Sequence, residues 1–177
     1  MRVCKSIVSD NPAMKNVKQK VPGYSDLHWR WYGLDDMKPA LLYDLLALRE
    51  AIFVVEQSCI YHELDGLDKT ARHLLLTQKE EVVACLRVLP PAVNGGNVRI
   101  GRVAVCLRWR KRGLARTMLE NAIEKIRQRH PSSGIYLDAQ TYLQPFYSSI
   151  GFQVCGEEFL DEGIAHIPMK MKKVFLK

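Results

Sequence analysis

The stretch from Val98 to Arg116, VRIGRVAVCLRWRKRGLAR, constrains the fold more than any other part of this 177-residue chain. Its first half, Val98–Cys106, is an apolar run interrupted only by two arginines and a glycine, which is typical of a central strand. A basic segment at 108–112 then leads to Gly113, and apolar residues follow at helical spacing. This order predicts a buried strand, a short cationic loop and an amphipathic helix that ends near His130.

The remaining pattern predicts a mixed sheet with helices on both faces. Apolar runs predict further strands at Leu27–Tyr32, His73–Thr77, Val82–Leu89, Ile135–Ala139, Phe152–Leu160 and His166–Met171. Helical spacing and turn residues predict a helix capped by Asp36, with Pro39 in its first turn, to about Val55, a loop at Gln57–Thr70 and a short helix at Leu143–Ile150. The order is β–α–β–β–β–α–β–α–β–β. An antiparallel meander that leads into a strand–helix–strand crossover favours a single α/β domain with three layers. Its sheet is expected to mix parallel and antiparallel strands, as in an α+β mixed sheet.

Composition indicates an ordinary globular domain over residues 27–177, preceded by an extension at 1–26 that we expect to be mobile or loosely docked. No apolar run approaches the roughly 18 residues that a membrane span needs, and the N-terminus lacks a secretory signal. Five scattered cysteines, an odd number, argue for reduced thiols. We therefore expect a cytoplasmic protein without a membrane partner, either a monomer or a homodimer.

The cationic loop is the strongest indication of a binding site. A helix N-terminus presents unpaired N–H groups and a partial positive charge, which suit a phosphate, and Gly113 allows an anion to approach the backbone. Arg108, Arg110, Lys111 and Arg112 add charge at the same place. Neither the Gly-Lys-Ser/Thr of a Walker loop nor a G-x-G-x-x-G fingerprint is present. A solvated basic turn and a nucleic-acid-binding patch that includes Trp109 remain alternatives.

Two ordered segments resemble the Gcn5-related N-acetyltransferase (GNAT) family. Arg110–Ala115, RKRGLA, is similar to the family's Q/R-x-x-G-x-G/A motif, and Leu143–Phe152 is similar to its Phe-Tyr-x-x-x-Gly-Phe segment. Leu48–Gln57, Tyr61–Asp68 and Gly163–Ile167 resemble the ElaA-like subgroup. The resemblance covers about 27–171 and implies the GNAT-like acyl-CoA N-acyltransferase fold. It also implies an enzyme that transfers acetyl from acetyl-coenzyme A to a small-molecule or peptide amine, by direct attack in a ternary complex.

The resemblance also implies roles for individual residues. Residues implied to bind the cofactor are Val103, Ala104 and Val105 through their backbone, and Arg110, Lys111, Arg112, Gly113, Leu114 and Ala115 around the pyrophosphate. Tyr147 is expected to donate a hydrogen bond or proton to the departing thiolate, because a phenol stays protonated at neutral pH. A catalytically silent coenzyme A sensor or scaffold is the alternative.

The acceptor side is predicted from charge. Glu56 and the loop that follows it carry four carboxylates up to Asp68 and no lysine or arginine, so we expect a negative field that attracts a cationic amine, with Glu56 as the first candidate base. The predicted acceptor pocket consists of Gln57, Tyr61, Asp65, His73, Arg102, Gln140 and His166. Either histidine is an alternative proton acceptor. Cys59-x-x-His62 has no second ligand pair, so no metal site is predicted. No nucleic-acid partner is predicted either, because the basic run has no recognised DNA- or RNA-binding pattern around it.

Overall fold

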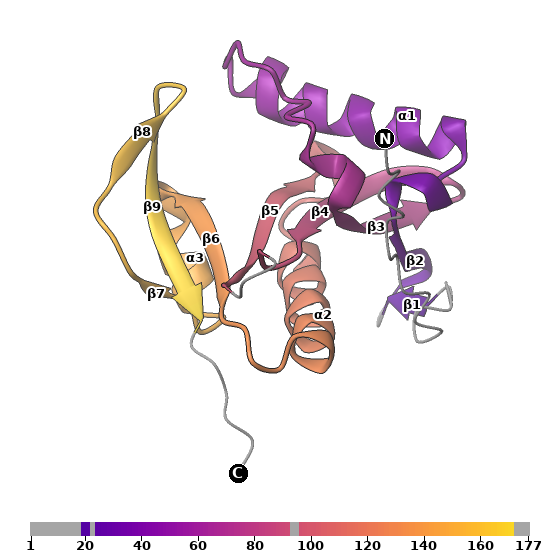
Figure 1. Cartoon of the computed structure of the whole chain (residues 1–177). Coiled ribbons are helices and arrows are strands. Elements are labelled where there is room, and N and C mark those ends of the chain that lie inside the picture. Colours follow the sequence, from indigo (N-terminus) through magenta and orange to yellow (C-terminus); the bar gives the residue numbers. More distant parts are fainter. Residues whose placement is uncertain (1–18, 22–23, 93–95, 172–177) are drawn as a thin grey trace, which may run out of the picture.

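The computed structural model describes residues 19–21, 24–92 and 96–171, whose strands form one mixed sheet (Figure 1). Its strand order is β1 (Gln19–Val21), β2 (Tyr24–Tyr32), β3 (Arg72–Gln78), β4 (Glu81–Leu89), β5 (Val98–Val105), β6 (Ile135–Gln140), β9 (Ile164–Met171) and β7 (Gln153–Val154), with β8 (Phe159–Asp161) also paired to β9. The β5–β6 pair is parallel, whereas every other pair is antiparallel. The predicted meander and crossover are confirmed.

Helices cover both faces of this sheet, as predicted. On one face α1 (Pro39–Glu50) packs through Leu45 against Leu75 and Cys85. On the other face α2 (Leu114–Arg129) packs its apolar stripe against β4 and β5, and α3 (Gln144–Ser148) joins the same core through Tyr147. Burial of these two apolar faces is the main source of the fold's stability.

The first helix differs in detail from the prediction. Pro39 is its first residue, but Lys38 rather than Asp36 occupies the N-cap, and no side chain caps the helix. The Asp36 carboxylate instead accepts a hydrogen bond from the Gly33 N–H at 2.8 Å and pairs with Arg72. Beyond Glu50 the chain continues as one π-helical segment, Ala51–Glu56, a rare geometry that often occurs near functional sites.

The predicted strand Phe152–Leu160 is wrong, because two short strands, β7 and β8, take its place. The interruption lies opposite Pro168 of β9, which has no N–H to donate to a continuous ladder. Gly156 also lies so close to Pro168 that a Cβ there would approach the ring carbon to 2.9 Å. A proline and a glycine therefore separate the two short strands.

At the N-terminal end, the sheet includes part of the predicted extension. β2 begins at Tyr24, three residues before the predicted domain start, and β1 pairs with it. Residues 1–18 lie outside the described residues, and the division of the chain at residue 27 stays a prediction.

The feature that positions the site is the divergence of β5 from β6. Their parallel pairing is confined to Val98–Ile135 and Arg99–Tyr136. At Arg102 the backbone adopts a φ of 51°, and the pairing with β4 shifts register at the same point. Such a bulge bends a strand and increases its twist. Beyond Arg99, the edge of β5 that faces β6 therefore has no strand partner among the described residues.

Candidate active site

The loop between β5 and α2 forms a concave row of backbone N–H groups. Lys111 and Gly113 both have left-handed backbone conformations, with φ of 60° and 77°. Among the described residues, no acceptor is hydrogen-bonded to the N–H groups of residues 111–116; the first pairing is Thr117 N–H to the Gly113 carbonyl at 3.1 Å. Left-handed residues in a turn that leaves successive N–H groups without acceptors are typical of an anion-binding nest, and the N-terminus of α2 lies at the same place.

The four cationic side chains of this loop fall into two groups. Arg108 forms an ion pair with Glu81, and Arg110 forms two hydrogen bonds of 2.7 Å to the carboxylate of Glu56. Lys111 and Arg112 are exposed and pair with no carboxylate in the described part of the chain. The Arg112 guanidinium instead lies 4.7 Å from the centre of the Trp109 ring. Lys111 and Arg112 are therefore the cations available to an anion in the nest.

Arg110 links the loop to the strand that precedes it. Its Nε donates a hydrogen bond of 2.9 Å to the carbonyl of Val105, the last residue of β5. Because the same side chain holds Glu56, it connects three elements: β5, the π-helical segment and the nest. The unpaired edge of β5 at Val103–Val105 thus leads directly to the unpaired N–H groups of residues 111–116.

Tyr147 lies on α3 and is 7% exposed. Its ring packs edge-to-face against Phe146 and Phe152, with ring centres 5.2 and 6.0 Å apart. Burial raises the pKa of its hydroxyl to about 12, with a smaller contribution from Tyr142. The phenol is therefore protonated at neutral pH and able to donate a hydrogen bond.

The predicted negative field of the acidic loop is wrong, because arginines from other elements neutralise it. Arg49 of α1 contacts Glu63 at 2.8 Å and Asp68 at 2.9 Å. Arg87 of β4 pairs with Asp65 and Asp68, and Arg102 of β5 pairs with Glu63. Three guanidinium groups thus balance three carboxylates in a largely buried network, and Glu56 is balanced separately by Arg110.

The titration properties of the loop reflect this pairing. Burial acts to raise the pKa of Asp65, but hydrogen bonds from Arg87 and from the Leu67 N–H lower it to about 2.

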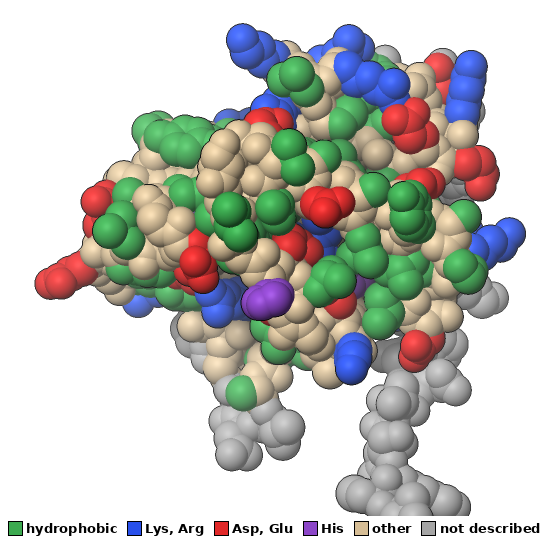
Figure 2. All heavy atoms as spheres, turned by 90° about the horizontal axis from the view of Figure 1, so that it is seen from above, with side chains coloured by type: hydrophobic (Ala, Val, Ile, Leu, Met, Phe, Trp, Pro, Cys, Tyr) green, Lys and Arg blue, Asp and Glu red, His purple; other side chains and the backbone are tan. Residues whose placement is uncertain are grey.

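The face of the molecule seen in Figure 2 is also not uniformly acidic, because exposed apolar side chains lie between the acidic ones. Val55, Ile60, Leu64 and Leu160 are among the exposed apolar side chains of the protein, and Ile60 is 95% exposed.

Comparison with known proteins identifies the family. The family model described as an acetyltransferase (GNAT) domain matches residues 42–173. The chain belongs to the GNAT family. A UPF0039 protein of Schizosaccharomyces pombe is 38% identical over 146 residues, which cover 81% of this chain and 95% of the relative. This GNAT protein is therefore an acyltransferase, as the resemblance implied.

Solved structures agree with the GNAT assignment. An acyl-CoA N-acyltransferase from Pseudomonas aeruginosa superimposes with a TM-score of 0.78 and 36% identity, covering 82% of this chain and 99% of that one. Escherichia coli ElaA gives a TM-score of 0.78 and 35% identity over the same shares of the two chains. The predicted GNAT fold and the resemblance to the ElaA-like subgroup are confirmed.

Three of the residues predicted to line the acceptor pocket of this GNAT protein lie together where β5 and β6 diverge. Gln140, at the end of β6, donates a hydrogen bond of 3.0 Å from its side chain to that of Gln57. His166 is the β9 partner of Gln140, and its ring stacks on Phe159. Paired residues of antiparallel strands project to the same face, so these side chains share one side of the sheet.

The other predicted pocket residues have different surroundings. Tyr61 lies 5.8 Å from the Arg102 guanidinium, and both border the Glu63–Asp65 network. His73 does not lie with them: it is 1% exposed on β3, which β4 and β5 separate from β6, and its Nε2 is 3.8 Å from Asp68. Burial lowers the pKa of His73 to about 4, so the imidazole is neutral at pH 7.

The structure also reveals polar residues near the divergence that the sequence interpretation missed. Tyr136 donates a hydrogen bond of 2.6 Å to Asp138, which also pairs with Arg99 of β5. Tyr136, Asp138 and Gln140 alternate with the buried residues Ile135, Leu137 and Ala139, so they project to the face opposite α2. Apolar and polar residues alternate in the sequence IYLDAQ, so the sequence could have predicted that these three polar side chains share one face of the strand.

Neither a membrane-spanning helix nor a cluster of metal-ligating side chains is present in the described part of the chain. No helix there is long and apolar enough to cross a bilayer. Among the same residues, no group of three or more histidine, cysteine, aspartate or glutamate side chains is placed to hold a metal ion. The Cys59 thiol, from the Cys59-x-x-His62 sequence, is directed to the Glu162 carbonyl at 3.4 Å.

Proposed function

We propose that this protein transfers an acetyl group from acetyl-coenzyme A to an amine by direct attack in a ternary complex. The observation that carries the proposal is the continuity between the unpaired edge of β5 and the unpaired N–H groups of residues 111–116. Acetyl-coenzyme A, when bound, supplies a thioester at the end of an amide-containing arm and a pyrophosphate at the other end of that arm. One ligand of this kind satisfies both sets of backbone groups.

The chain's own groups divide the work of binding. The N–H groups of residues 111–116 hold the pyrophosphate, Gly113 leaves the approach open, and Lys111 and Arg112 supply positive charge. The backbone of Val103–Val105 pairs with the arm, and an N–H on this edge polarises the acetyl carbonyl. Arg110 acts indirectly, since its guanidinium is engaged by Glu56 and by the Val105 carbonyl.

Tyr147 is proposed to donate a hydrogen bond or proton to the departing sulfur. Its hydroxyl is protonated because burial raises the pKa to about 12, and its packing against Phe146 and Phe152 holds the ring in one orientation. A fixed donor in a poorly hydrated site stabilises a developing negative charge more strongly than water does.

Glu56 is better suited to positioning than to general base catalysis. Both of its carboxylate oxygens accept hydrogen bonds from Arg110, which lowers the pKa of the carboxyl below its ordinary value. A base acts best when its pKa lies near the working pH, and Glu56 is shifted in the opposite direction. We therefore propose that Glu56 fixes Arg110 and, through it, the end of β5.

The proposed acceptor pocket lies on the side of the sheet where Gln57, Gln140 and His166 meet, bordered by Tyr61 and Arg102. The neutralised acidic loop offers no strong field for a polycation, so selection of the acceptor depends on hydrogen bonding and shape rather than on charge. Small-molecule and peptide amines both fit this description.

Two measurements test the proposal. Calorimetry with acetyl-coenzyme A should show saturable one-site binding that Lys111→Gln and Arg112→Gln weaken, whereas Arg108→Gln, whose side chain is paired with Glu81, should have little effect. Release of free coenzyme A in the presence of an amine panel should then identify the acceptor. Binding without release for any amine would indicate a silent coenzyme A sensor, and absence of binding would refute the proposal.

A further inference from the structure

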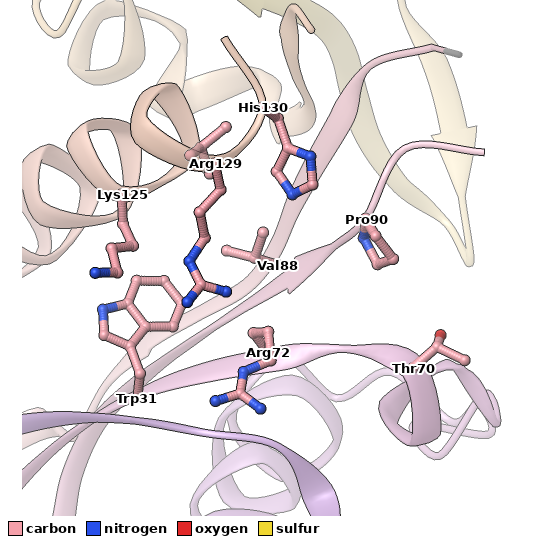
Figure 3. Close-up of a pocket in the computed structure, with 9 residues that line it drawn as sticks. Trp31, Thr70, Arg72, Val88, Pro90, Lys125, Arg129 and His130 are labelled. Carbon is pink, nitrogen blue, oxygen red and sulfur yellow. The ribbon is translucent and has the colours of Figure 1, made fainter. Parts of the chain in front are cut away.

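A second site lies at the far end of α2 from the nest. A small pocket opens there between the C-terminal end of α2 and strands β2, β3 and β4 (Figure 3). Its lining consists of Trp31, Thr70, Arg72, Val88, Pro90, Lys125, Ile126, Arg129 and His130. The 16 residues of α2 at about 1.5 Å per residue place it roughly 24 Å from Gly113. The pocket is therefore separate from the proposed acetyl-coenzyme A site.

The rim of the pocket is cationic. Lys125 and Arg129 extend from α2 toward Trp31 and Arg72 on the neighbouring strands, and no carboxylate is among the lining residues (Figure 3). Arg72 pairs with Asp36 at 3.2 Å, but Lys125 and Arg129 form no ion pair with any described residue. Burial, followed by the positive charge of Arg72, lowers the pKa of Arg129. Lys125 and Arg129 thus have no counterion among the described residues, whereas the Arg72 guanidinium is engaged by Asp36.

The base of the pocket is apolar and rigid. Val88 and Ile126 are buried, and the Trp31 ring is held in place by a hydrogen bond of 3.2 Å from its Nε1 to Asn121. An indole ring beside cationic side chains provides a flat apolar surface within reach of charge. The combination suits a ligand that has an anionic end and a flat apolar body.

The position of the pocket at a helix C-terminus does not prevent anion binding. The end of α2 contributes a partial negative charge of about half a unit, and a cation in the last turn is common for that reason. Lys125 and Arg129 carry two positive charges, which exceed that partial charge, whereas the charge of Arg72 is paired with Asp36.

We propose that this pocket binds a small organic anion, a phosphate monoester or carboxylate joined to a planar apolar group. The anionic end lies between Lys125 and Arg129, which have no counterion among the described residues, and the planar group packs on Trp31. Binding at this place changes the surroundings of Trp31 while it leaves the nest at Gly113 free.

The test is calorimetry and tryptophan fluorescence on the full chain with phenyl phosphate, benzoate and inorganic phosphate, in saturating coenzyme A to fill the nest. We expect one-site binding of phenyl phosphate or benzoate, whichever anionic end the pocket prefers, at least about 10-fold tighter than that of inorganic phosphate. Arg129→Gln and Lys125→Gln should each weaken binding by about 10-fold or more. Lys170→Gln, which removes one exposed charge from β9, is the charge-matched control and should bind normally.

The melting temperature of Arg129→Gln without ligand provides an independent measurement. Because Arg129 forms no ion pair with a described residue, Arg129→Gln should keep the melting temperature, whereas the aromatic anion should raise the melting temperature of the wild type only. The proposal is overturned if neither aromatic anion binds, if binding survives Arg129→Gln, or if Arg112→Gln at the nest abolishes it. Tighter binding of inorganic phosphate than of phenyl phosphate and benzoate would also overturn it.

Discussion

At the scale of single residues, Tyr147 provides the most direct test of the chemistry. Tyr147→Phe removes one hydroxyl and keeps the edge-to-face packing with Phe146 and Phe152. We expect kcat to fall by roughly 10-fold or more, the usual range for general acid assistance, with the affinity for acetyl-coenzyme A unchanged. Steady-state kinetics and calorimetry measure the two quantities. Tyr142→Phe, at a side chain that is 74% exposed, is the control, and normal turnover of Tyr147→Phe would exclude the phenol from the mechanism.

Glu56 allows a second test at the same scale, because a base and a positioning group respond differently to pH. Arg110 keeps the pKa of Glu56 below its ordinary value, so the carboxylate stays ionised from about pH 6 to 9. We expect Glu56→Gln to change the overall rate but to leave the shape of the pH–rate profile unaltered. Glu50→Gln, at an exposed position of α1, is the matched variant. Loss of the acid limb in Glu56→Gln alone would restore Glu56 as the base.

At the scale of the element, the turn into α2 is tested by comparing two glycines. Gly113 and Gly66 have nearly the same left-handed φ, 77° and 78°, and an added Cβ would meet no atom within 4 Å at either position. Gly113→Ala and Gly66→Ala should therefore each cost about 1 kcal/mol of unfolding free energy through backbone strain. Only Gly113→Ala should weaken binding of acetyl-coenzyme A, because only that methyl group stands in the anion's approach. Equal affinities for the two variants would contradict the nest.

The element α1 is tied to the loop after it by the buried Arg49. This side chain is 1% exposed and contacts both Glu63 and Asp68. Arg49→Met leaves buried carboxylates with fewer partners, and we expect a loss of about 3 kcal/mol in chemical denaturation. Glu81→Gln, which breaks the exposed pair with Arg108, should cost much less. A loss no larger than that of Glu81→Gln would show that the network adds little to stability.

At the scale of the whole molecule, stability should depend on pH through His73. Burial lowers its pKa from 6.5 to about 4, so the unfolded chain binds the proton more readily between these values. Its contribution is therefore complete above pH 6.5 and is lost as pH falls toward 4, by up to about 3 kcal/mol. His73→Gln should flatten the free energy of unfolding across this window, and His62→Gln, at an exposed position, should not. Asp65 and Asp68 have lowered pKa values, so their contribution to stability is lost only at lower pH.

Local patterns predicted the crossover well because each of its parts is specified by neighbouring residues. Val98–Cys106 has the composition of a buried strand, and the spacing of Leu114, Met118 and Ala122 places one face of α2 in the core. The C-terminal hairpin was predicted less well. Its interruption depends on the pairing of Cys155 and Gly156 with Pro168, which lies on another strand.

The acceptor side shows most clearly which property cannot be predicted from neighbouring residues, namely the net charge around a loop. The loop between Glu56 and Asp68 contains no lysine or arginine, so its own residues indicate a strong negative charge. The neutralising arginines are distant in sequence, up to 54 residues away in the pair of Arg110 and Glu56. Position along the chain does not reveal which of the many cationic side chains of a basic protein will approach a given carboxylate. For the same reason, the sequence did not predict that Lys125, Arg129 and Arg72 line one pocket.

The sequence by itself determined the family, the order of most elements and the turn with unpaired N–H groups at the start of α2. These depend on residue spacing and on the conformational freedom of glycine, which act over a few residues. The tertiary structure alone decided which charges are cancelled, which polar side chains share the face beside the divergence of β5 and β6, and where a second cationic pocket opens. Those outcomes depend on contacts between distant segments, because electrostatic and packing energies are set by separation in space.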